Sequence, residues 1–307
     1  MGISSSSSRP RLALTLGDPR GIGPELVAKA LGADGVGDLA DFVLVGPTGA
    51  GLDVQVDVGH WHPDDGAATA GRLAGLAIEA AVGLARDGVV QGIVTAPLDK
   101  AALHAGGYDF PGHTEMLGAL TGTVPAMMLA ATRPSFAGGT PLRVVLATTH
   151  VALRDVPRLL TAEAIGRAAD LTRDHLRRWF GVAEPRIALC ALNPHAGDGG
   201  RFGSEDDDLL APAARANGLI GPLPADTVFV RAMRGAFDAV IAPYHDVGMT
   251  AIKVAAFGSA VNVTLGLPFP RTSPDHGTAL DIAGRGIADP SSFHEAVRLC
   301  ATLARTA

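Results

Sequence analysis

The stretch RVVLATTHVALRDVPRLLTAEAIGRAADLTRDHLRRWF, residues 143–180, decides the class of fold. It begins with the short apolar run Arg143–Thr148, which is typical of a strand that is buried on both faces. It continues with apolar residues at helical spacing over Thr161–Phe180. A buried strand followed by a helix is the repeating unit of α/β proteins, in which helices cover both faces of a sheet.

The same alternation extends over most of the 307 residues. Further strand-like runs are Leu12–Leu16, Phe42–Val45, Gly92–Thr95, Arg186–Leu192, Ala239–Ala242 and Ala260–Thr264. Further helical patterns are Pro24–Leu31, Ala67–Asp87 and Asp207–Asn217. Short strands that alternate with helices predict an α/β fold with mostly parallel sheets. The glycine-rich stretch Gly106–Gly112 and the loop Arg133–Pro141 are the candidate crossings between two lobes.

The composition excludes several classes of protein. Hydrophobic residues make up 47% of the chain and charged residues 18%, which provides a sizeable core. A net charge of -6 without a Lys/Arg-rich run argues against a nucleic acid or an anionic membrane as the main partner. Cys190 and Cys300 are too few for a disulfide framework, and the start MGISSSSSRP lacks the apolar core of a signal peptide. We therefore expect a cytoplasmic protein with a flexible tail at residues 1–8.

Three histidines each follow one of the apolar strand runs. His150 ends VVLATTH, His195 ends ALCALNPH and His245 lies in AVIAPYHD. Ligands of open α/β sheets gather at the carboxyl ends of the strands. Three imidazoles on one divalent ion leave coordination positions open for a substrate, which is the layout of a catalytic metal site. For any one of them, the alternative that the imidazole only hydrogen bonds within a turn stays open.

Other candidate residues lie in loops and near the third histidine. The segment GDPRGIGPE, residues 17–25, joins the first strand to a helix and would present free amides to an anion, or is simply a structural turn. Lys253, Asn262 and Arg271 follow His245 and would suit an anionic, hydroxylated substrate.

Six motifs together resemble the 4-hydroxythreonine-4-phosphate dehydrogenases of pyridoxal 5'-phosphate biosynthesis. In chain order they are LGDPRGIGPE, GHTEML, TTHVALRDV, LNPHAGDGGRFGSED, YHDVGMTAIK and VNVTLGLPFPRTSPDHGTALDIAGRG. The resemblance runs from about Leu12 to Asp289. It implies a two-lobed fold similar to isocitrate and isopropylmalate dehydrogenases, with an active site in the cleft between the lobes. The lobes would comprise residues 9–125 with 285–307, and residues 126–284.

The resemblance also implies roles for individual residues. The metal ligands fall on His150, His195 and His245, with His245 reaching the ion of the neighbouring subunit of a homodimer. The substrate contacts fall on His113, Thr114, Lys253, Asn262 and Arg271. The run from Asp275 to Gly284 resembles the loop that holds the adenosine half of the cofactor, through Asp275, His276, Gly277, Thr278, Asp281 and Ile282.

The implied reaction is an oxidation by NAD or NADP that depends on a divalent ion such as zinc, magnesium or cobalt. Hydride leaves carbon 3 of 4-phosphooxy-L-threonine, and the resulting 3-oxo acid loses carbon dioxide to give 3-amino-2-oxopropyl phosphate. Asp246 and Lys253 are the candidate general bases, and Asp246 could instead orient an imidazole. Arg285 alone does not decide between NAD and NADP.

Three departures from the common family pattern leave the substrate open. Val247 stands where glutamine is frequent, Asp99 stands where asparagine is frequent, and residues 50–65 form a shorter segment. Relatives with nearly the same motifs oxidise phosphorylated threonate or erythronate, or a terephthalate cis-dihydrodiol. A metal-dependent phosphatase is the alternative from another class, although it would not need the adenosine loop.

Overall fold

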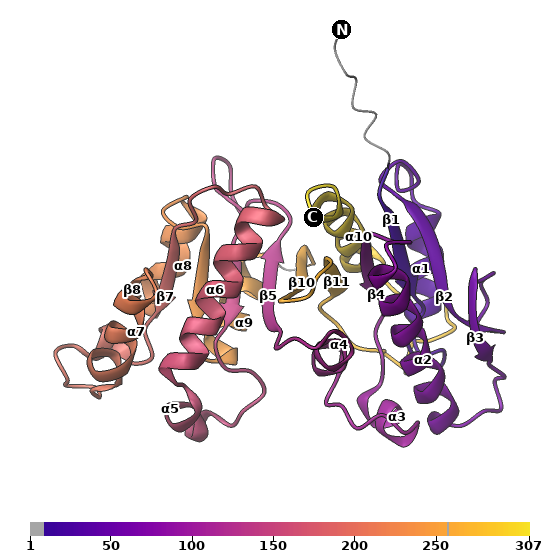
Figure 1. Cartoon of the computed structure of the whole chain (residues 1–307), viewed down its shortest axis with the longest axis horizontal. Coiled ribbons are helices and arrows are strands. Elements are labelled where there is room, and N and C mark those ends of the chain that lie inside the picture. The colour runs from indigo at the N-terminus through magenta and orange to yellow at the C-terminus, as the bar shows by residue number, and fades with distance from the viewer. Residues whose placement is uncertain (1–8, 257) are drawn as a thin grey trace, which may run out of the picture. The chain divides into compact units, whose positions relative to one another are not determined.

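The computed structural model describes residues 9–256 and 258–307, so the predicted tail at residues 1–8 lies outside the described residues. The chain forms two compact units (Figure 1). Residues 1–122 with 268–307 make up unit 1, and residues 123–267 make up unit 2.

Unit 1 is built on five strands in the order β3-β2-β1-β4-β11, and their pairings are parallel. The strands are β1 (Arg11–Thr15), β2 (Asp41–Thr48), β3 (Val56–His60), β4 (Gly92–Thr95) and β11 (Arg271–Pro274). The helices are α1 (Gly23–Leu31), α2 (Ala67–Arg86), α3 (Lys100–Ala105), α4 (His113–Thr121) and α10 (Ser291–Ala304). The C-terminal helix α10 packs on β11, β4 and α1, which ties the two ends of the chain into one core.

Unit 2 contains six strands in the order β10-β5-β6-β9-β7-β8. They are β5 (Ala126–Ala131), β6 (Arg143–Leu146), β7 (Ile187–Cys190), β8 (Ile220–Leu223), β9 (Ala239–Ala242) and β10 (Ala260–Leu265). Strand β5 is antiparallel to both β10 and β6, whereas the other pairings are parallel. The helices are α5 (Val156–Leu159), α6 (Ala162–Arg178), α7 (Ala211–Ala216), α8 (Ala225–Met233) and α9 (His245–Ala255), with single turns η1 (Leu153–Asp155), η2 (Pro194–Gly197) and η3 (Asp206–Leu210).

The predicted α/β class with mostly parallel sheets is confirmed. Strands β4 and β9 have the predicted bounds, and β1, β2, β6, β7 and β10 differ from the prediction by a few residues at their ends. The division into units differs from the expected one at residues 123–125, which group with unit 2, and at residues 268–284, which group with unit 1. The physical reason is that Arg271 and Thr272 of β11 pair with Ile93 and Val94 of β4.

Helix α2 is the one helix of the described residues that is long and apolar enough to cross a membrane, with a mean hydropathy of 1.3. Half of that window is buried, and α2 packs on β1, β2 and α3. Its glycines permit the close approach to α3: a Cβ on Gly71 would lie 1.8 Å from the carbonyl oxygen of Ala102. These contacts are those of a core helix.

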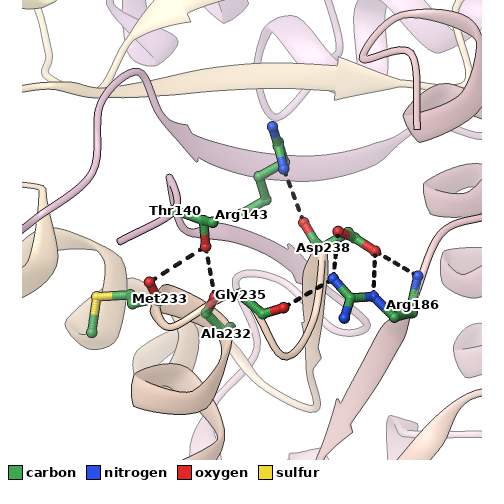
Figure 2. Close-up of polar contacts among 7 residues, drawn as sticks. All are labelled: Thr140, Arg143, Arg186, Ala232, Met233, Gly235 and Asp238. Atoms are coloured by element: carbon green, nitrogen blue, oxygen red, sulfur yellow. Dashed lines mark hydrogen bonds and ion pairs between the residues drawn. The ribbon is translucent and has the colours of Figure 1, made fainter. Parts of the chain in front are cut away.

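A polar cluster fixes the starts of β6, β7 and β9 in unit 2 (Figure 2). The carboxylate of Asp238 accepts hydrogen bonds from the Arg186 backbone N–H at 2.8 Å and from its guanidinium at 3.3 Å. Arg143 donates to the Asp238 carbonyl at 3.1 Å and lies over the Phe180 ring at 4.6 Å. The cluster links the amino ends of the three strands whose opposite, carboxyl ends are followed by the histidines.

Candidate functional site

The three predicted histidines follow the carboxyl ends of β6, β7 and β9 in unit 2, as the sequence predicted. His150 lies in the bend beyond β6, His195 in the turn η2 beyond β7, and His245 is the first residue of α9 beyond β9. His150 has a φ of 46° and His195 a φ of 55°, in the left-handed region that L-residues rarely adopt. Such strained residues cluster at functional sites, where the surrounding structure holds them.

Two of the three imidazoles lie together within the chain. The ring centroids of His150 and His245 are 5.6 Å apart, and the rings are tilted by 43°. Two imidazoles bound to one ion through nitrogen–metal distances of about 2.1 Å would have centroids separated by roughly 5 Å, so this pair fits a shared divalent ion. His195 instead lies beside Phe202, with centroids 6.4 Å apart. Among the described residues of one chain, no group of three His, Cys, Asp or Glu side chains could hold a metal.

Asp246 contacts the ring of its neighbour. Its Oδ1 lies 2.7 Å from Nδ1 of His245, and its side chain is 80% exposed. A carboxylate on one ring nitrogen fixes the imidazole and leaves the other nitrogen for a metal. The contact therefore favours the orienting role that the sequence left open for Asp246. Lys253 follows in the last turn of α9, and Asn262 lies within β10, where its Oδ1 is buried without a hydrogen-bond partner in the described residues.

A buried carboxylate that the sequence did not single out holds the loop before His195. Asp206 is fully buried and accepts hydrogen bonds from the backbone N–H groups of Leu192 and Asn193, both at 2.9 Å. The Asn193 side chain in turn donates to Glu205 at 2.8 Å. The acidic run of residues 205–208 was the only signal in the sequence, and it does not tell which carboxylate is buried.

The other predicted substrate contacts lie in unit 1. Arg271, at the start of β11, is 1% exposed and donates a hydrogen bond to Oγ1 of Thr95 on β4. Burial lowers the pKa of Arg271 to about 9, so the guanidinium stays charged at neutral pH. His113 and Thr114 begin α4, and burial together with the charges of Arg271 and Lys100 lowers the pKa of His113 well below its usual 6.5. A neutral imidazole thus lies near two cations.

The predicted adenosine loop is anchored to α1 of the same unit. The Ile22 N–H donates to the Thr278 carbonyl at 2.9 Å, and a Cβ on Gly21 would lie 2.9 Å from that residue. Lys29 donates to the carbonyls of Gly286 and Ala288 at 2.9 and 2.7 Å. Asp281, His276 and Gly277 are exposed, Thr278 is buried, and Asp275 and Ile282 are half-buried. A loop that is hydrogen bonded to the start of α1 and exposes polar groups fits one half of a dinucleotide.

The same α1 entry loop carries an ion-pair chain that the sequence did not reveal. Asp18 is fully buried, and its carboxylate accepts two bonds from the Arg20 guanidinium, at 3.1 and 2.7 Å. Arg20 also lies 3.8 Å from Asp99, which caps α3 by accepting from the Ala102 N–H at 2.6 Å. Asp99 thus joins the first βα loop to the start of α3.

The comparisons with known proteins identify the family of this chain. The family described as "Pyridoxal phosphate biosynthetic protein PdxA" matches residues 41–300. The chain belongs to the PdxA family. A PdxA relative from Methylorubrum populi, named 4-hydroxythreonine-4-phosphate dehydrogenase, is 43% identical over 98% of this chain and 96% of its own. A relative from Bradyrhizobium diazoefficiens, provisionally named D-threonate 4-phosphate dehydrogenase, is 45% identical over 95% of this chain and 96% of its own.

Solved structures of close and of distant sequence share the fold of this chain. A 4-hydroxythreonine-4-phosphate dehydrogenase from Klebsiella pneumoniae superimposes with a TM-score of 0.85 at 36% identity, and covers 98% of this chain and 100% of its own. The isocitrate dehydrogenase of Methylococcus capsulatus shares only the fold, with a TM-score of 0.50 at 17% identity over 93% of this chain and 83% of its own. The predicted family and fold class are therefore confirmed.

Proposed function

We propose that this chain is a divalent-metal-dependent and NAD(P)-dependent dehydrogenase of 4-phosphooxy-L-threonine in the cytoplasm. The observation that carries the proposal is similarity over nearly the whole length to relatives named for this activity. The motifs that resemble those of the family also carry the predicted site residues, from His113 to Asp281, which supports the proposal. A nicotinamide and a divalent ion would together supply the hydride acceptor and the charge that stabilises the oxidised oxygen.

The residues of the chain bind and orient the substrate in this proposal. His150, His195 and His245 would hold the ion, and Asp246 would fix the ring of the third ligand. Arg271, the neutral His113, Lys253 and Asn262 would bind the oxyanion groups of the substrate. A bound nicotinamide would accept the hydride from carbon 3, and the proton of the 3-hydroxyl would pass to a base for which Lys253 is the candidate. The resulting 3-oxo acid would release its carboxylate as carbon dioxide.

The test is an assay of nicotinamide reduction by absorbance, run with and without a chelator. The substrates are 4-phosphooxy-L-threonine, D-threonate 4-phosphate, a phosphorylated erythronate and a terephthalate cis-dihydrodiol. Turnover fastest with the first supports the proposal, and turnover confined to the second would assign the activity named for the relative from B. diazoefficiens. A phosphatase would release inorganic phosphate without reducing the nicotinamide.

His195→Ala tests the metal assignment. We expect the variant to lose metal-dependent turnover and bound metal while it keeps its fold, because His195 is exposed. The control is His104→Ala, which removes an imidazole that is 71% exposed on α3. Full metal content in His195→Ala would contradict the assignment of this residue, whatever the activity.

Mixing two variants tests whether the site is shared within a homodimer. If His150 of one chain and His245 of its partner hold the same ion, a mixture of His150→Ala and His245→Ala chains forms heterodimers with one intact site. In an equimolar mixture half of the dimers would be heterodimers, so activity would rise from near zero toward about a quarter of the wild-type value. If the two histidines that lie 5.6 Å apart in one chain hold the ion together, the mixture stays inactive.

A further inference from the structure

The chain uses lysine at only three positions, Lys29, Lys100 and Lys253, and fills its other cationic positions with arginine. The two residues are not interchangeable, because an ammonium is a compact point charge with three rotatable donors, whereas a guanidinium is a rigid planar fork. In a chain with so few lysines, each lysine is therefore a candidate for a contact that requires a compact ammonium group.

The structure explains one of these lysines directly. The ammonium of Lys29 binds Glu25 at 2.8 Å and the carbonyls of Gly286 and Ala288, just beyond the predicted cofactor loop. These three acceptors match its three donors. Lys253 is already a predicted substrate contact. Lys100 has no such explanation, because it is exposed and its ammonium makes no hydrogen bond or ion pair within residues 9–256 and 258–307.

Lys100 nevertheless has a defined place. It is the first residue of α3, directly after the capping Asp99, which in turn lies 3.8 Å from Arg20. Its Cε lies 3.4 Å from where a Cβ of Gly112 would be, so its side chain runs along the residue before α4. Oε2 of Glu115 lies 3.7 Å from the same point.

The neighbours of Lys100 form an incomplete oxyanion site. His113 follows Gly112, and its Nε2 is buried without a hydrogen-bond partner in the described residues. Arg271 is charged, buried and close enough for its charge, with that of Lys100, to lower the pKa of His113. Lys100 of α3 and Arg271 of β11 thus both lie near the imidazole of His113 at the start of α4, within unit 1.

We propose that the Lys100 ammonium binds the phosphate group of the substrate, beside His113 and Arg271. The proposal rests on the proposed function for the identity of the substrate, but phosphate binding by this site is independent of turnover. A dianionic phosphate matches the two positive charges of Lys100 and Arg271, and its oxygens would accept hydrogen bonds from the Lys100 ammonium. Lys100 is thus a further binding residue, and Asp99 and Arg20 position it.

The test uses the full-length protein with its lysines ¹³C-dimethylated, which keeps their charge. Three lysine signals are expected, and that of Lys100 is assigned as the one missing in Lys100→Arg. Titration with inorganic phosphate should shift the Lys100 signal saturably, whereas acetate at the same concentration should not. A Lys100 signal that ignores phosphate, or that responds equally to acetate, overturns the proposal.

Kinetics provide the second measurement. Lys100→Met should raise KM for 4-phosphooxy-L-threonine roughly tenfold, the size expected for one charged hydrogen bond, with little change in kcat. Lys100→Arg should recover part of this loss. The control Arg86→Met removes an exposed cation of the same unit, at the end of α2, and should leave KM unchanged.

The two hypotheses fail differently. If the wild-type protein reduces no nicotinamide with any substrate but its Lys100 signal follows phosphate, the proposed function fails and the phosphate site stands. If turnover is normal and Lys100→Met changes KM less than twofold, the Lys100 assignment fails and the function stands.

Discussion

Asp206→Asn should destabilise unit 2 and displace His195. The two carboxylate oxygens of Asp206 each accept one backbone N–H, from Leu192 and from Asn193, at 2.9 Å, and the side chain is fully buried. An asparagine has one oxygen and one NH₂ group. One backbone N–H therefore keeps its acceptor, and the other faces a donor in a site that water does not reach.

The expected cost follows from these two contacts. A hydrogen bond to a charged group contributes about 1.5–3 kcal/mol, and a buried donor left without an acceptor costs about 1–3 kcal/mol. We expect a loss of about 2–4 kcal/mol in the free energy of unfolding, which lowers the melting temperature by on the order of 10 °C. Because Asn193 leads directly into the turn of His195, metal affinity should also fall by about tenfold.

Calorimetry and metal titration of matched variants measure both effects. Asp207→Asn is the control, since it removes the same charge from the next residue, which is exposed. Its stability should stay within about 0.5 kcal/mol of the wild-type value. Equal melting temperatures for the two variants would refute the conclusion that the Asp206 carboxylate holds this loop.

Two further predictions concern packing and pH. Gly71→Ala should lower the free energy of unfolding by about 3 kcal/mol in denaturant, because its Cβ would lie 1.8 Å from the Ala102 oxygen. The control Gly83→Ala in the same helix meets nothing within 4 Å and should stabilise by up to about 1 kcal/mol. Equal effects of the two substitutions would contradict the close approach of α2 and α3. Burial lowers the pKa of His175, whose Nε2 accepts from the Gly266 N–H at 3.1 Å, so below pH 6.5 the unfolded chain binds a proton that the folded chain does not. The free energy of unfolding should therefore fall as the pH drops below 6.5, by up to about 1.4 kcal/mol per pH unit for this group. A His175→Gln variant whose stability falls with pH as steeply as that of the wild type would contradict this prediction.

The fold was predictable where a strand is short, apolar and bounded by polar residues. Gly92–Thr95 and Ala239–Ala242 are such runs, and the structure has strands with these bounds. Strand β11 was not predicted, because RTSP carries polar residues, yet all four are buried by pairing with β4 and packing under α10. The missed β11 also explains why the expected boundary between the lobes fell at residue 284.

The positions of the candidate ligands were predictable to the level of strand ends and no further. A histidine that follows a buried strand lies at the carboxyl edge of the sheet for any conformation of the loop between them. All three histidines lie at this edge. Which of them share an ion depends on loop geometry. The structure brings His150 and His245 together and leaves His195 beside Phe202. The spacing of apolar residues in the sequence does not predict this arrangement.

The loop of His195 shows why local sequence is insufficient there. His195, Ala196 and Asp198 all have φ between 46° and 57°, next to glycines that adopt positive φ freely. Each L-residue in this region costs about 1–2 kcal/mol, so the local preference of the chain opposes the conformation. The compensation comes from the Asp206 carboxylate and from the Asn193–Glu205 hydrogen bond, which hold the start of the loop from its far side. The place of His195 is thus a tertiary property, and an intact His195 in a chain without the Asp206 carboxylate should bind metal poorly.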